Sequence, residues 1–363
     1  MIFRLAVLLT AAVATPLAAQ TQAPPDAYAA GRAVVAEIDR IVTPHGVQET
    51  FVADLGGTRQ VVSVRGADRD NPILLFVHGG PGAVEMPIAW SFQRPWEDYF
   101  TVVQWDQRGA GRSYPLNDRA KLAPTLTPDR YRDDTIELIE VLRKRYAKRK
   151  IVLMGHSWGS VVGLSVAAKR PDLLYAYVGM GQLIDFRENE RIGFEAALAH
   201  ARAEGNSTAT TALEGLRPYP GPGAFDVHKT DIERKWSVHY GGLAAYRDNA
   251  DFYFHATNLS PEYTRDDLQA WRDGATFTIA TMFPQLATVS FASLKHLDVP
   301  VVLFLGRHDE TCPAGIASAW LDALDAPAKQ AVWFEHSAHL PMIEEPGRVF
   351  AALLDRVLPL TKA

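Results

Sequence analysis

The pattern of apolar positions along the chain predicts a mostly parallel β-sheet with helices on both faces, the α/β class. Six short runs are apolar at consecutive positions instead of alternating with polar ones. They are 73–77, 101–105, 151–154, 174–178, 300–305 and 331–334. A strand that is apolar on both sides must be covered on both faces, which is typical of parallel sheets whose strands are connected by helices.

Two further runs, 48–54 and 59–65, predict an antiparallel hairpin at the edge of this sheet. They flank Gly56 and Gly57, and glycine adopts the positive φ angles that a tight hairpin turn requires. Ahead of the hairpin, residues 27–42 carry apolar side chains at helical spacing. We therefore expect an N-terminal helix packed on the domain.

A crossover helix is expected over residues 132–146, between the second and third runs. Ile136, Ile139 and Leu142 fall on one face of such a helix, with acidic residues near its start and basic residues near its end. This order of charges offsets the helix dipole. The basic run 143–150 is therefore interpreted as the end of a helix rather than as an anion-binding patch.

The rhythm of strands stops between residues 183 and 295. A stretch of this length, rich in charged and aromatic side chains, is too long for a loop. It predicts an inserted helical cap with a rigid turn at 217–223. The expected organisation is a first core segment over 20–182, a helical cap over 183–295 and a second core segment over 296–363.

The first residues have the composition of a secretory signal peptide. Residues 1–19 place one cation, Arg4, ahead of a short apolar run that ends in small residues. This run is too short to span a bilayer and no other run is long enough, so we expect no stable membrane insertion. The expected location is secreted or periplasmic after removal of the signal peptide.

Charge and cysteine content narrow the possible partners. The formal net charge of −5 provides no electrostatic footprint for nucleic acid. The single cysteine, Cys312, excludes an internal disulfide and a cysteine-based metal site, and the histidines lack metal-ligand spacing. We expect no metal and no cofactor, and a small-molecule or short-peptide substrate as the partner. No feature of the sequence indicates an oligomeric state.

The strongest chemical signal is the G-x-S-x-G sequence at 155–159, between the strand at 151–154 and a helix-like segment. Its glycines permit a strained turn that lifts the hydroxyl of Ser157 above the sheet. A serine hydroxyl needs a base to remove its proton before it can act as a nucleophile. The motif therefore predicts a carboxylate and a histidine later in the chain, in that order.

The carboxylate is expected after a late strand, where Asp309 follows the run at 300–305. Asp309 is the preferred orienting acid and Glu310 is the alternative. His308 shares a turn with Asp309 and cannot bridge that acid to the serine, so we interpret it as structural. After the last strand, His336 and His339 are both candidates for the base. We prefer His339, because it lies further into the loop and can reach back over the sheet.

Acyl transfer also requires hydrogen-bond donors for the oxyanion. The backbone N–H of Trp158, directly after the serine, is one candidate, and the glycine-rich loop 78–82 supplies the other. The segment 105–113 follows the neighbouring strand. Its Asp106 and Arg108 are expected to tie loops together by ion pairing rather than to touch substrate.

Taken together, HGGPG (78–82), WDQRGAGRS (105–113), GHSWGS (155–160), GRHDETCP (306–313) and SAH (337–339) resemble the proline iminopeptidase family of α/β-hydrolases. The resemblance covers residues 70–182 and 297–350. It implies an α/β-hydrolase fold, Ser157, Asp309 and His339 as the catalytic triad, and Gly80 with Trp158 as the oxyanion donors.

Members of this family that remove an N-terminal proline use cap glutamates to bind the amino group of the substrate, often within a W-x-x-W-E pattern. This cap lacks the pattern, because Trp236 and Trp271 stand alone. The available acids are each expected to be solvated helix residues instead. They are Glu188, Glu190, Glu195 and Glu233.

The cap also contains aromatic residues that could form an apolar acyl pocket or the core of the cap itself. These are Phe252, Tyr253, Phe254 and Trp271. We expect most of them to belong to the cap core.

Three functions compete. The first is an exported peptidase of the proline iminopeptidase type. The second is a carboxylesterase or lactonase acting on a small apolar ester. The third is a non-catalytic binding protein on the same fold, which the presence of all three triad residues disfavours.

Overall fold

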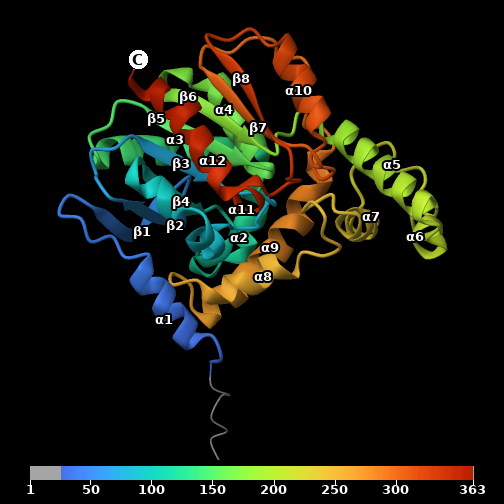
Figure 1. Cartoon of the computed structure of the whole chain (residues 1–363), viewed down its shortest axis with the longest axis horizontal. Coiled ribbons are helices and arrows are strands. Elements are labelled where there is room, and N and C mark those ends of the chain that lie inside the picture. Colours follow the sequence, from blue (N-terminus) through green and yellow to red (C-terminus); the bar gives the residue numbers. More distant parts are fainter. Residues whose placement is uncertain (1–25, 363) are drawn as a thin grey trace, which may run out of the picture.

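The computed structural model describes residues 26–362, which form one eight-stranded sheet flanked by helices (Figure 1). The strand order is β1-β2-β4-β3-β5-β6-β7-β8, and β2 alone runs in the direction opposite to the other strands. The strands are β1 (Val47–Leu55), β2 (Thr58–Gly66), β3 (Ile73–Val77), β4 (Thr101–Asp106), β5 (Ile151–His156), β6 (Leu174–Met180), β7 (Val301–Gly306) and β8 (Lys329–Phe334). The predicted α/β class and edge hairpin are confirmed, and the ends of the strands differ from the prediction by two residues at most.

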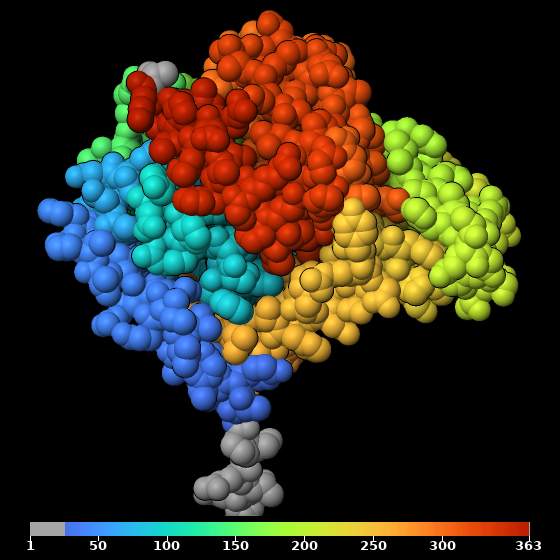
Figure 2. Space-filling view, viewed as in Figure 1, coloured from blue at the N-terminus to red at the C-terminus, as the bar shows by residue number. Residues whose placement is uncertain are grey.

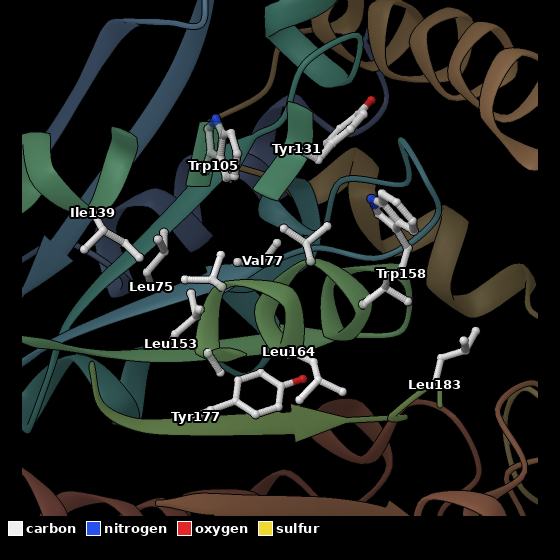
Figure 3. Packing of buried hydrophobic residues seen from close by; sticks show 14 of the residues in the cluster. Leu75, Val77, Trp105, Tyr131, Ile139, Leu153, Trp158, Leu164, Tyr177 and Leu183 are labelled. Carbon is white, nitrogen blue, oxygen red and sulfur yellow. The ribbon is translucent and has the colours of Figure 1, made fainter. Parts of the chain in front are cut away.

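The sheet separates two apolar cores, which explains why its strands are apolar at consecutive positions. Along β3, Leu75 and Val77 point to one core, whereas Leu74 and Phe76 point to the other. The first core packs against helices α3 and α4, as the sticks around α4 in Figure 3 show. All five residues of β3 are buried. Helices therefore cover both faces, as the pattern predicts.

Most of the α-helices lie between successive strands along the chain, as expected of crossover connections in a parallel sheet. The α-helices are α1 (Ala29–Ile38), α2 (Arg119–Leu122), α3 (Pro128–Arg145), α4 (Trp158–Lys169), α5 (Phe186–Glu204), α6 (Ser207–Glu214), α7 (Val227–His239), α8 (Asp251–Ala256), α9 (Arg265–Leu286), α10 (Ala314–Ala323), α11 (Pro341–Glu344) and α12 (Pro346–Ala352). Helix α3 is the predicted crossover helix, and it begins four residues earlier than expected because Thr127 caps it and Pro128 opens it. Its buried face includes Leu138, whereas Ile136 is only partly buried.

The chain between β6 and β7 forms the inserted helical layer, α5 to α9. Helices α5 and α6 protrude at the right of Figure 2, whereas α8 and α9 run along the core. A small apolar cluster that includes Phe194, Leu198 and Trp236 holds α5, α6 and α7 together. The insertion thus has an outer part with its own core and an inner part packed on the main domain.

Helix α1 forms as predicted but has no buried residue. It lies beside the turn after α8, where Arg32 donates a hydrogen bond to the carbonyl oxygen of Asn258 (3.1 Å). The predicted signal peptide, residues 1–19, falls outside the described residues. Among the helices of residues 26–362, none combines the length and apolarity needed to cross a bilayer.

Candidate active site

Ser157 stands on a strained turn between β5 and α4. Its φ of 54° and ψ of −122° are unusual for a residue with a side chain. The turn depends on its two glycines, because a Cβ on Gly155 would lie 2.2 Å from the carbonyl oxygen of Gly159, and a Cβ on Gly159 would lie 1.9 Å from that of Val77. This geometry is that of a nucleophile elbow.

The structure brings Asp309 and His339 together from the loops after β7 and β8. His339 Nδ1 lies 2.9 Å from Asp309 Oδ2, and both side chains are almost fully buried. The other carboxylate oxygen of Asp309 accepts a hydrogen bond from the Cys312 backbone N–H (2.7 Å). Asp309 is thereby held in place at both oxygens. Ser157 and His339 line the same pocket.

The alternative residues lie elsewhere. Glu310 pairs with His200 Nε2 (2.9 Å), not with His339. The His336 side chain is exposed, and its backbone N–H binds Glu345 (3.0 Å). His308 is also exposed and contacts the Tyr246 hydroxyl (3.0 Å). The geometry thus favours Asp309 and His339 over the candidates beside them.

The glycine-rich loop 78–82 is fixed beside Ser157 by buried polar contacts. The Gln107 backbone N–H donates to His78 Nε2 (3.2 Å), and the Gln107 side chain donates to the His78 carbonyl oxygen (2.9 Å). Burial lowers the pKa of His78 to about 4, so its ring is neutral. Gly80 has a φ of 113° that only glycine adopts readily, and it lines the pocket with Gly79.

Trp158 opens α4, so its backbone N–H is one of those without an acceptor inside the helix. Its indole packs edge-on against Tyr131, with ring centroids 5.6 Å apart (Figure 3). The packing of this side chain fixes the first turn of α4. Trp158 directly follows Ser157 in the chain, and Gly80 lines the same pocket as Ser157, so their role as oxyanion donors stays a prediction.

A pocket of about 190 Å³ opens at Ser157, at the carboxyl ends of the parallel strands. Its lining consists of Gly79, Gly80, Ala83, Glu85, His156, Ser157, Leu243, Tyr253, Phe254, Trp271, Thr311, His339 and Leu340. The prediction that most of the cap aromatics form the cap core is wrong, because Tyr253, Phe254 and Trp271 line this pocket and only Phe252 does not. The reason is that α8 and α9 pack on the core rather than on the rest of the insertion.

The inner part of the insertion is seated on the core by close backbone contacts. A Cβ on Gly82 would lie 3.2 Å from Ala275 Cα, and a Cβ on Gly274 would lie 2.8 Å from the carbonyl oxygen of Gly109. Thr278 Oγ1 also donates a hydrogen bond to that oxygen (2.9 Å). Helix α9 is thus held against the loops after β3 and β4.

Asp106 and Arg108 connect segments of the chain, as expected of supporting residues. Asp106 accepts hydrogen bonds from the Tyr263 hydroxyl (2.6 Å) and from the Arg112 backbone N–H (2.8 Å). Arg108 makes a fully buried, two-pronged ion pair with Asp134 (2.8 and 2.9 Å). Neither Asp106 nor Arg108 is among the pocket-lining residues.

The cap glutamates divide into two kinds, and none of them lines the pocket. Glu188 and Glu195 are partly exposed and pair with Arg191 and Arg217, as expected of solvated residues. The same expectation is wrong for Glu190 and Glu233, which are completely buried.

Arg234 explains why Glu190 and Glu233 are buried, because its guanidinium pairs with both carboxylates. The Tyr219 hydroxyl donates a further hydrogen bond to Glu190. Burial, with the nearby charge of Glu190, raises the pKa of Glu233 to about 7 despite the arginine.

Two carboxylates near the site, the buried Glu85 and the partly buried Glu344, were not identified from the sequence. Glu85 lines the pocket and pairs with His156 Nδ1. Glu344 accepts hydrogen bonds from the backbone N–H groups of Ala338 (3.0 Å) and Leu340 (3.1 Å), on either side of His339. The signal for both was their position: Glu85 lies three residues beyond the glycine-rich loop, and Glu344 lies five beyond the histidine.

Within residues 26–362, no three histidine, cysteine, aspartate or glutamate side chains are arranged to hold a metal ion. The groups at the site are those of acyl transfer. They are a serine on an elbow, a buried histidine–carboxylate pair and a glycine loop.

This fold and this arrangement define an α/β-hydrolase, and comparison with known proteins agrees. The family model for the alpha/beta hydrolase fold matches residues 72–346. The chain therefore belongs to this family of enzymes. The resemblance inferred from the motifs is confirmed.

Among individual relatives, the probable aminopeptidase YbaC of Bacillus subtilis (strain 168) is 33% identical over 306 residues, 83% of this chain and 93% of the relative. The proline iminopeptidase of Saccharolobus solfataricus is 26% identical over 319 residues, covering 82% of this chain and 88% of the relative.

Solved structures show the same fold. A proline iminopeptidase-related protein from Thermus thermophilus superposes with a TM-score of 0.61 at 20% identity, covering 86% of this chain and 99% of that one. A putative aryl esterase from Burkholderia cenocepacia superposes with a TM-score of 0.56 at 17% identity, covering 87% and 100%. At these identities the likeness concerns the fold alone.

Proposed function

We propose that this protein is a serine hydrolase that cleaves an amide bond through an acyl-enzyme, as an aminopeptidase similar to proline iminopeptidases. The observation that carries the proposal is the buried hydrogen bond between His339 Nδ1 and Asp309 Oδ2 beside a pocket that Ser157 lines. The relatives named aminopeptidase and proline iminopeptidase, aligned over most of the chain, favour amide over ester as the bond cleaved.

In this mechanism His339 takes the proton of the Ser157 hydroxyl, and the serine oxygen attacks the substrate carbonyl carbon. Asp309 holds the imidazole in the tautomer whose Nε2 is free to accept that proton, and it stabilises the imidazolium that forms. His339 then gives the proton to the leaving amine. Water, deprotonated by the same histidine, releases the acyl group and regenerates the serine.

The negative charge on the substrate oxygen is stabilised by the backbone N–H groups of Gly80 and Trp158. Both are held by rigid surroundings, the Gln107–His78 contacts on one side and the packed indole on the other. Donors that are already in place need no reorganisation during the reaction, which is the source of their effect on rate.

Parallel assays of proline 4-nitroanilide and short-chain 4-nitrophenyl esters on the purified chain test the bond cleaved. We expect turnover of the anilide and inhibition of that turnover when the amine of the substrate is blocked. A fluorophosphonate probe should label Ser157 in the wild type and not in Ser157→Ala. Absence of labelling in the folded wild type would contradict catalysis and favour the non-catalytic binding protein.

A carboxylesterase or lactonase is the second candidate, and the wall of the pocket favours it. Tyr253, Phe254 and Trp271 present an aromatic surface suited to an apolar acyl group. Rapid cleavage of neutral esters together with no detectable cleavage of any aminoacyl anilide would select this function.

The proposed location is outside the cytoplasm, either secreted or periplasmic. The proposal rests on the signal-like composition of residues 1–19. N-terminal sequencing of the protein recovered from an exporting host should give a chain that begins close to residue 20. A product that retains residues 1–19 and stays in the cytoplasm would contradict it.

A further inference from the structure

Glu85 is the carboxylate that faces the substrate pocket. Among the described residues that line the pocket, Glu85 carries a carboxyl group and none is a lysine or arginine. Glu85 is 2% exposed, and it is the residue from which the turn at Met86–Ser91 starts. It therefore belongs to the rigid core, three residues beyond the loop that contains Gly80.

One oxygen of this carboxylate is used and the other is free. Oε1 pairs with His156 Nδ1, whereas the buried Oε2 has no hydrogen-bond partner within residues 26–362. A buried carboxylate oxygen without a donor is costly, and such groups in folded proteins call for an explanation. A donor brought by a ligand would satisfy it.

His156 links the used oxygen of Glu85 to the loop that carries His339. His156 Nε2 lies 2.8 Å from the carbonyl oxygen of His339 and must carry a proton to donate to it. Nδ1 faces Oε1 of Glu85. Burial opposes a charge on this ring, yet the charge and hydrogen bond of Glu85 outweigh burial and raise the pKa of His156. Glu85 Oε1 is thus fixed by a buried contact, and Oε2 is the oxygen left for a ligand.

The cap glutamates are less suited to bind a cation. Glu190 and Glu233 already share the guanidinium of Arg234 and are absent from the pocket lining. Glu233 Oε1 also lacks a hydrogen-bond partner among residues 26–362, but it does not face the pocket that Ser157 lines. Glu85 combines a free carboxylate oxygen with a place in the pocket lining.

We propose that Glu85 binds the α-amino group of an aminoacyl substrate and so selects acyl groups that carry a free amine. This inference rests on the proposed function and deepens it by naming the group that recognises the amine. His156, which Glu85 holds, directly precedes Ser157 in the chain, and Gly80 belongs to the loop just before Glu85. Glu85 and Ser157 line one pocket, so a substrate whose carbonyl lies at Ser157 can present its α-amine to Glu85.

The test compares two esters, because an ester can be hydrolysed whichever bond the natural substrate contains. Alanine methyl ester carries the α-amine and methyl propanoate lacks it. For each variant, kcat/KM for alanine methyl ester is divided by kcat/KM for methyl propanoate. Comparing this ratio between variants cancels the difference in intrinsic reactivity of the two esters. In Glu85→Gln, which keeps the size of the side chain and removes its charge, we expect kcat/KM for alanine methyl ester to fall about 10- to 100-fold. For methyl propanoate we expect a change of about threefold or less.

The matched variant is Glu233→Gln, which removes a buried cap carboxylate. Its ratio of the two kcat/KM values should equal that of the wild type. An equal loss on both esters in Glu85→Gln would show that Glu85 acts only by positioning His156 and the histidine loop, and would overturn the proposal. Loss of the amine preference in Glu233→Gln alone would overturn it as well.

The same assays separate this inference from the proposed function. If the wild type cleaves proline nitroanilide but Glu85→Gln leaves the ester ratio unchanged, the function stands and the inference fails. If no anilide is cleaved but the ester ratio depends on Glu85, the inference stands and the peptidase function fails.

A binding measurement covers the case in which Glu85→Gln loses all turnover. In Ser157→Ala, alaninamide should bind at least tenfold more tightly than propanamide, as followed by NMR titration. In the double variant Ser157→Ala, Glu85→Gln, the two amides should bind alike if the variant keeps the folded spectrum. Equal binding of the two amides to Ser157→Ala itself would contradict the role of Glu85.

Discussion

At the scale of single residues, the site depends on close backbone approach around Ser157. A Cβ added at Gly159 would lie 1.9 Å from the Val77 carbonyl oxygen and 2.8 Å from that of His78, and Val77, at the end of β3, cannot move without disturbing the sheet. Only glycine fits at this position. The requirement is one of volume, because no positive φ is needed there.

We therefore expect Gly159→Ala to destabilise the protein by more than about 3 kcal/mol, beyond the usual cost of overpacking. Denaturant unfolding measures this. Gly315→Ala in α10 is the matched control, because a Cβ there meets no atom within 4 Å. Gly315→Ala should leave the free energy of unfolding equal to that of the wild type or raise it slightly. A Gly159→Ala protein as stable as the wild type would show that the elbow is looser than described.

The pairing of Asp309 with His339 predicts a selective loss of catalysis. Asp309→Asn should lower kcat by about 10⁴-fold with little change in KM, because the amide no longer holds the required histidine tautomer. Glu310→Gln is the control and should change kcat by less than about threefold, since Glu310 contacts His200. Comparable losses in the two variants would mean that the acid has been assigned to the wrong residue.

At the scale of elements, the loop between β8 and α11 positions the histidine. Glu344, in α11, accepts backbone hydrogen bonds from Ala338 and Leu340, and a third from Ala245 of the insertion (2.6 Å). The His339 backbone N–H is fixed separately by the Leu243 carbonyl oxygen (3.0 Å). One short helix thus holds the loop and the insertion together.

Glu344→Ala leaves these three backbone donors without their acceptor. We expect it to lower the free energy of unfolding by about 1–3 kcal/mol and, because the loop then moves, to lower kcat by roughly tenfold or more. Urea unfolding and steady-state kinetics measure both effects. Glu335→Ala, which removes a surface partner of Arg307, should change neither appreciably. Unchanged kcat in a destabilised Glu344→Ala protein would show that the loop needs no such support.

The elements were predictable to different degrees, for physical reasons. The parallel strands could be predicted from the sequence, because burial on both faces requires apolar residues at consecutive positions, as in β3. The orientation of α8 and α9 was not, since Tyr253 and Trp271 would look the same in a cap core and in a pocket wall. Burial of Glu190 depends on Arg234, 44 residues later, a separation that no local periodicity reveals.

At the scale of the whole molecule, buried carboxyl groups should make stability depend on pH. Burial raises the pKa of Glu233 and of Glu344 to about 7, and that of Asp39 to about 6. Each folded pKa lies above the value in the unfolded chain, so the folded state retains protons that the unfolded state has lost. The stability from these groups is present at low pH and disappears as the pH rises through 6 to 7.

We therefore expect the free energy of unfolding to fall between about pH 6.5 and pH 8. His156, whose pKa is also raised, acts in the same direction. His78, with a pKa of about 4, opposes the trend only below the ordinary histidine pKa of about 6.5. Urea unfolding at both pH values measures the change, and Glu233→Gln should reduce it. A rise in stability over this interval would contradict the raised pKa values.

The whole molecule also shows how far the candidate site could be inferred from sequence. The order of strands brings the loops after β3, β5, β7 and β8 to one edge of the sheet, so the motifs of Ser157, Asp309 and His339 could be combined before the structure was known. Glu85 has no motif of its own. Its importance depends on which of its oxygens has a partner, and that is a property of three-dimensional packing.

The seating of α9 on the core has a consequence for the timescale of turnover. Because the backbone of α9 touches the loops around Gly82 and Gly109, the wall that carries Trp271 cannot swing away as a lid. Phe254, 51% exposed and packed on Trp271, is the movable part of that wall. Exposed side chains rotate within picoseconds to nanoseconds, whereas lids open in microseconds or longer. Entry of substrate and departure of product past Phe254 would then be fast compared with bond cleavage.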